Sequence, residues 1–119
     1  MRRGTYYVIR INKPGADEKY TFDSISGHLT DITLPSGKVL HIGIKNYGKD
    51  YRSKGNYYYN ATDLDSGMGI LKKSFFRNTK ELIDYVSQPD YLAAIDEVVK
   101  SDYYKDMVQR MNAFLNQRS

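Results

Sequence analysis

The chain has 119 residues, of which 40% are apolar and 27% charged, and its formal net charge is +4. This length and composition fit one globular domain, residues 1–119. The absence of cysteine excludes a disulfide framework, a thiolate nucleophile and a cysteine-ligated metal, and it suits a reducing compartment. No apolar segment reaches the length of a signal-peptide core or of a membrane span of about 20 residues, so we expect a soluble cytoplasmic protein with no membrane contact.

The first two-thirds of the chain shows the period-two alternation of β-strands, interrupted by turn residues. Residues 35–37, Pro-Ser-Gly, predict a type I turn within a hairpin. Leu40, Ile42 and Ile44 then alternate on the inward face of its second strand. Residues 63–67 predict another hairpin. The expected strands cover residues 5–11, 19–23, 28–34, 38–44, 57–62 and 68–73.

From residue 78 onward the apolar spacing becomes helical. Asn78 precedes Glu81 by three positions, a capping-box pattern that starts a helix. Pro89 ends this helix and opens the next. Ser101 predicts a third start, although nothing there prevents the last two helices from being continuous.

This order of elements predicts an α+β fold. We expect an N-terminal, hairpin-rich antiparallel β-sheet of five to six strands in residues 1–77. Two or three C-terminal α-helices, from residues 78–119, are expected to pack on one face of it.

Residue types for catalysis are scarce. His28 and His41 are the two imidazole bases in the sequence, and a lone strand histidine is more often structural than catalytic. Asp63 and Asp65 near Gly67 resemble the start of a calcium loop, but the required glutamate is missing, so we interpret them as turn residues. We expect a non-enzymatic protein with no catalytic residue, no metal site and no cofactor. The alternative is a small metal-dependent hydrolase or nuclease that uses the two aspartates.

Positive charge is concentrated in the sheet region. Residues 1–77 hold 13 Lys and Arg against 7 Asp and Glu, whereas residues 78–119 hold 5 against 7. The chain also has twelve tyrosines and no tryptophan, so most of its aromatic rings carry a polar tip. Such an excess of cations fits a nucleic-acid partner without requiring one.

The segment 45–59, KNYGKDYRSKGNYYY, carries the main functional signal. Cations neutralise phosphates and flat rings stack on bases, so this segment predicts a nucleic-acid-binding accessory module. The expected contact residues are Lys45, Tyr47, Lys49, Tyr51, Arg52, Lys54 and Tyr58. Further cations extend the patch if the strand order brings them together: Arg2, Arg3, Lys72, Lys73 and Arg77. The structural alternative is a solvated hairpin loop whose tyrosines fix it to the sheet.

The same residue types also suit a protein contact, because tyrosine and arginine are enriched at interfaces. The alternative function is therefore a protein-interaction or inhibitor module of the phage or mobile-element type. Such a module blocks a host protein complex or sequesters a nucleotide-like ligand. Met107 and Met111, beside Phe114 and Leu115, form an apolar stripe that could pair with a second copy in a homodimer or with a partner helix. Core packing is the commoner use of such a stripe.

Overall fold

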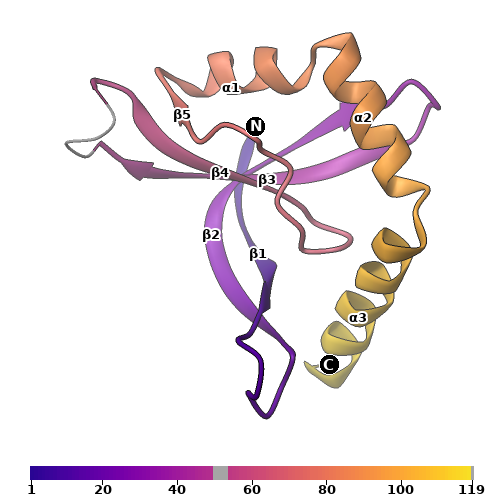
Figure 1. The fold of residues 1–119 in the computed structure, drawn as a ribbon. Helices are drawn as coiled ribbons and strands as arrows, with labels where there is room; N and C mark the ends of the chain where they lie inside the picture. Colours follow the sequence, from indigo (N-terminus) through magenta and orange to yellow (C-terminus); the bar gives the residue numbers. More distant parts are fainter. Residues whose placement is uncertain (50–53, 119) are drawn as a thin grey trace.

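Figure 1 shows the computed structural model of the protein, which describes residues 1–49 and 54–118. One antiparallel sheet, in which each strand pairs with the next in chain order, is followed by three helices. The elements are β1 (Arg2–Ile11), β2 (Tyr20–Thr33), β3 (Val39–Gly48), β4 (Tyr57–Asp63), β5 (Phe75–Phe76), α1 (Thr79–Val86), α2 (Pro89–Val99) and α3 (Asp102–Arg118). The predicted α+β fold is confirmed.

Two predicted strands are a single strand in the structure. Apart from residues 19 and 34, the predicted segments 19–23 and 28–34 lie in the long strand β2, which pairs with β1 from Tyr20 to Leu29 and with β3 from His28 to Thr33. The intervening Ser-Ile-Ser-Gly sequence has the composition of a turn. Pairing with β1 keeps it extended, because strand propensity is readily overridden by cross-strand contacts.

The predicted strand at 68–73 is wrong. In this segment Gly69 makes an isolated bridge to Thr62, and β5 lies further on, at Phe75–Phe76. Ile70 and Leu71 are consecutive, yet both pack against the hydrophobic core. A regular strand would send them to opposite faces, so the segment cannot bury both and remain a strand.

The predicted turn at 35–37 is confirmed. The Gly37 N–H donates to the Leu34 carbonyl at 2.9 Å, and Gly37 has a φ of +91°, which a residue without a side chain adopts readily. Asp96 of α2 binds this turn through both carboxylate oxygens, which accept from the Ser36 N–H at 2.9 Å and from the Ser36 hydroxyl at 2.8 Å. The hairpin is thereby fixed to the helical layer.

The helix boundaries follow the predicted caps. The Asn78 side chain accepts from the Glu81 N–H at 2.8 Å, and Pro89 is the first residue of α2. The Ser101 hydroxyl oxygen accepts from the Tyr104 N–H at 3.1 Å. This cap separates α2 from α3, so the last two helices are distinct.

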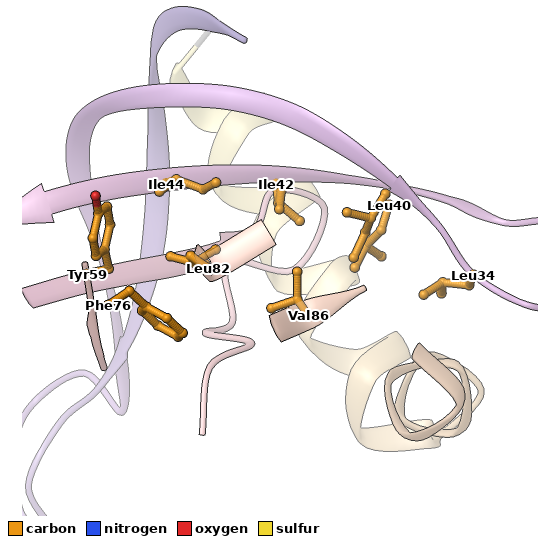
Figure 2. Close-up of a cluster of buried hydrophobic side chains, with 10 residues drawn as sticks. Leu34, Leu40, Ile42, Ile44, Tyr59, Phe76, Leu82 and Val86 are labelled. Atoms are coloured by element: carbon orange, nitrogen blue, oxygen red, sulfur yellow. The ribbon is translucent and has the colours of Figure 1, made fainter. Parts of the chain in front are cut away.

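The main core lies between α1 and the middle of the sheet. Figure 2 shows Leu82 and Val86 pointing toward the β3 side chains Leu40, Ile42 and Ile44. All five are buried, as predicted for the β3 residues. Tyr59 and Phe76 extend this core along β4 and β5 (Figure 2).

A second packing region joins α3 to the β1–β2 half of the sheet (Figure 1). Phe114 stacks on Phe22 with ring centroids 4.3 Å apart and meets Tyr7 edge-on at 4.9 Å. Met107 and Met111 are buried, which confirms core packing for these two members of the stripe, whereas Leu115 is exposed. The three helices thus cover one face of the sheet.

Candidate nucleic-acid interface

The register of the sheet defines which residues lie on the face opposite the helices. Directly paired residues of antiparallel strands share a face, and neighbours along a strand alternate. Since Ile42 and Ile44 face the helices, Gly43 and Lys45 lie on the opposite face. We call this second surface the open face. It also carries the partners of Gly43 and Lys45 on the flanking strands: Leu29, Thr62 and Asn60.

Three aromatic rings lie together at the β3–β5 end of the open face. Tyr58 is the central ring, 5.4 Å from Tyr47 and 5.5 Å from Phe75 between centroids. The side chains of Tyr47 and Tyr58 are 50% and 36% exposed. A β-bulge between Asn46 and Gly48 shifts the register here and places Tyr47 beside Tyr58. The three rings form a contiguous aromatic patch that solvent can reach.

Two cations lie on the same face as this aromatic patch. The Lys45 ammonium lies 6.0 Å from the centre of the Tyr47 ring. Arg2 is exposed and pairs in register with Leu29, so it is on the open face at the sheet edge. Only Lys45 therefore adjoins the rings among the described residues, because Arg2 lies on β1 at the other edge of the sheet. A cation beside exposed rings favours a phosphate backbone with unstacked bases.

Tyr6 supports the open face from β1. Its ring lies over Gly43, so closely that a Cβ at Gly43 would approach a ring carbon to 2.5 Å. Tyr6 is 5% exposed. Burial, and then the nearby Tyr47 phenol, raise the pKa of Tyr6 to about 12.

The structure divides the predicted contact residues between several places. Lys45, Tyr47 and Tyr58 lie together on the open face. Lys49 is exposed, but its ammonium lies 5.0 Å from the Tyr57 ring, which by strand alternation faces the helical side. Lys54 is exposed in the turn before β4. Tyr51 and Arg52 lie outside the described residues.

The additional cations are also divided between the two faces. Arg2 shares the open face, whereas its neighbour Arg3 lies on the helical side by register. Lys73 lies over the Phe76 ring, and Arg77 donates to Glu81 at 2.9 Å, so both contact the helical layer. Lys72 is exposed on the segment before β5. The basic surface is therefore smaller than the sum of these residues implies.

Among the described residues, Asp63 and Asp65 do not belong to a group of acidic residues that could hold a metal ion. Asp63 is buried, and one of its oxygens accepts from the Ser66 N–H at 3.2 Å and from the Ser66 hydroxyl at 2.6 Å, as expected of a turn aspartate. Asp31 instead binds His41 on the open face, at 2.7 Å. Within residues 1–49 and 54–118 no group of three or more His, Asp or Glu is arranged to hold a metal ion.

Sequence reasoning did not identify Phe75 and Tyr6 as members of the open face. Phe75 was missed because the strand that contains it was expected earlier in the chain. Tyr6 was missed because its contact with Gly43 spans two strand pairings, whose order a single sequence does not contain. The two glycines of adjacent strands, Gly27 and Gly43, are the signal that a large ring crosses this part of the sheet.

None of the helices in the described part of the chain combines the length and apolar composition that crossing a lipid bilayer requires. Comparison with protein-family models, with curated proteins and with solved structures finds no match to this chain.

Proposed function

We propose that the protein is a non-enzymatic, cytoplasmic nucleic-acid-binding module whose open face binds single strands. The observation that carries this proposal is the contiguous patch of Tyr47, Tyr58 and Phe75, with Lys45 beside it. Open sheet faces with two or three aromatic rings are used by RNA-binding modules to stack unpaired bases. A duplex hides its base faces, so rings on a sheet favour a single strand.

The expected energetics set the size of the effect to be measured. Stacking of one base on one ring contributes about 1–3 kcal/mol, which is roughly 5-fold to 150-fold in affinity. Each phosphate contact adds about 0.7 to the slope of log affinity against log salt for a single strand. With few cations on the open face, we expect modest affinity that weakens as salt is raised.

The test is a fluorescence anisotropy titration with labelled single strands of about 12 nucleotides, in DNA and RNA form, and with a duplex of equal length. Salt is varied between about 50 and 200 mM. We expect single strands to bind more tightly than the duplex and the affinity to fall with salt. Absence of binding at the lowest salt would refute the proposal.

Two tyrosines of equal exposure provide a matched pair of variants. Tyr47 is 50% exposed on the open face, and Tyr103 is 51% exposed on α3. Tyr47→Ala is expected to weaken single-strand binding by at least about 5-fold, whereas Tyr103→Ala leaves it unchanged. Equal losses in both variants would show that the rings act by nonspecific contact. Lys45→Gln is expected to reduce the salt slope by about 0.7 with little change in fold.

The second candidate function is a protein-interaction or inhibitor module that uses the same face. It is favoured by Val8, Ile25 and Leu29, which are apolar, partly exposed and on the open face by register. Together with the rings they resemble the apolar centre and polar rim of a protein interface, either with a host complex or with a second copy. Sedimentation of the purified protein tests the homodimer form, and a monomer at all concentrations would exclude it.

A further inference from the structure

A cavity on the helical side of the sheet is separate from the open face. It has a volume of about 310 Å³ and lies between the segment 63–72 and helices α2 and α3. Exposed residues form its rim: Gly69, Lys72, Ala94 and Val98. An engineered apolar cavity of about 150 Å³ holds benzene, so this one has room for a ring with a short substituent.

The walls of the cavity are apolar, and its floor is polar. Leu40, Ile70, Ile95 and Val99 line the walls. Asp63, Ser66 and Tyr104 are buried beneath them and also line the cavity. A mostly apolar lining with a few polar groups is the usual constitution of a small-molecule site.

Two polar atoms of this floor have no hydrogen-bond partner among the described residues. They are the carboxylate oxygen Oδ1 of Asp63 and the hydroxyl oxygen of Tyr104. Burial, and then the adjacent Asp63 carboxylate toward which the phenol hydroxyl is directed, raise the pKa of Tyr104, although the two side chains do not form a hydrogen bond of ordinary geometry. An unpaired buried polar group costs about 1–3 kcal/mol, so each of these atoms would gain from a ligand that binds it.

The charge of Asp63 is not balanced by a neighbouring cation. Its other oxygen, Oδ2, accepts two hydrogen bonds from Ser66, which is uncharged. Within the described part of the chain, Asp63 forms no ion pair. Asp65 adds a second negative charge close by, and its field also acts on Tyr104. A buried carboxylate in this position favours a positively charged partner.

We propose that this cavity binds a small amine: an ammonium group on an apolar body of about one ring. The ammonium N–H groups donate to Asp63 Oδ1 and to the Tyr104 hydroxyl oxygen, and the ring occupies the apolar walls. Both acceptor atoms are shielded from solvent in the unbound protein, so binding requires the Tyr104 side chain to move away from Asp63. This site is independent of the proposed nucleic-acid function, since it lies on the other side of the sheet.

Three probes of similar size and different charge test the proposal. They are phenethylamine, phenethyl alcohol and phenylpropionate, titrated by calorimetry and by amide chemical-shift mapping. We expect the amine to bind at least about tenfold more tightly than the alcohol, and the acid to bind least, with shifts confined to the residues of the cavity. Equal affinity of amine and alcohol, no binding of either, or shifts outside the cavity would overturn the proposal.

Two neighbouring aspartates provide the matched variants. Asp63→Asn keeps the shape of the floor and is expected to remove the preference for the amine, whereas Asp65→Asn keeps that preference. Tyr104→Phe retains Asp63 and is expected to weaken amine binding several-fold. This variant tests the same site if Asp63→Asn fails to fold. Equal effects of Asp63→Asn and Asp65→Asn, or unaltered amine binding by Tyr104→Phe, would contradict the assigned contacts.

Discussion

Replacing Asp96 with alanine is expected to lower the free energy of unfolding by about 2–4 kcal/mol. Asp96 is 6% exposed, and its two oxygens accept from the backbone N–H and the hydroxyl of Ser36 at 2.9 and 2.8 Å. Hydrogen bonds to a charged group contribute about 1.5–3 kcal/mol each. Ser36 is exposed, so in Asp96→Ala water can bind the donors that Asp96 leaves. The expected loss in the free energy of unfolding is therefore smaller than the sum for two such hydrogen bonds.

A double-mutant cycle isolates the contact between the turn and α2. Ser36→Ala removes the hydroxyl donor and keeps the backbone N–H. In the Asp96→Ala background it should cost little, because its partner is already gone. The coupling energy is expected to be about 1–2 kcal/mol. Glu97→Ala is the adjacent control, since Glu97 is exposed and paired only with Lys100 at 3.7 Å among the described contacts, and its effect should stay within about 0.5 kcal/mol.

The assay is urea unfolding followed by circular dichroism. With a slope of about 1–3 kcal/mol per molar urea, the Asp96→Ala midpoint should fall by roughly 1–2 M. Additive effects of Ser36→Ala and Asp96→Ala would show that the two residues do not interact. An Asp96→Ala effect as small as that of Glu97→Ala would refute the view that this contact fixes the hairpin to the helical layer.

Three further changes test other parts of the structure. Burial raises the pKa of Tyr6 from 10.0 to about 12, so the stability that its neutral phenol contributes is fully present below pH 10 and is lost between about pH 10 and 12. Across this range, the free energy of unfolding in urea should fall by about 2–3 kcal/mol more in the unmodified protein than in Tyr6→Phe. Identical declines would contradict burial of the phenol. Gly43→Ala should destabilise the fold by about 1–3 kcal/mol, because its Cβ would meet the Tyr6 ring; a stabilised variant would place the ring elsewhere. Tyr104→Phe removes an unpaired buried hydroxyl, so thermal unfolding should show little change or a gain of up to about 1 kcal/mol, and a large loss would reveal a direct bond to Asp63.

Local patterns were sufficient to predict the parts of the fold that depend on neighbouring residues. The turn at 35–37, the buried alternation of Leu40, Ile42 and Ile44, and the caps at Asn78 and Ser101 each involve residues a few positions apart. Such contacts are contained in the spacing of residue types. These predictions agree with the structure for that reason.

Long-range contacts account for what the sequence did not reveal. The hydrogen bond between Ser36 and Asp96 joins residues sixty positions apart, and the local sequence around neither residue predicts it. The strand at 68–73 was mispredicted because the alternating pattern of this segment suggested a strand, whereas the segment buries the consecutive residues Ile70 and Leu71 against the same core. At the candidate site, Phe75 becomes a neighbour of Tyr58 only through the pairing of β4 with β5.

The run Tyr57-Tyr58-Tyr59 shows why the tyrosine surplus alone is a weak guide to function. Alternation along β4 gives consecutive rings different surroundings. Tyr59 is buried, and its hydroxyl lies 3.3 Å from that of Thr79 in α1, so it serves the core while its polar tip remains paired. Tyr58 faces the other way, onto the open face. A ring with a polar tip suits both positions, so the residue type does not distinguish core from binding surface, whereas strand parity does.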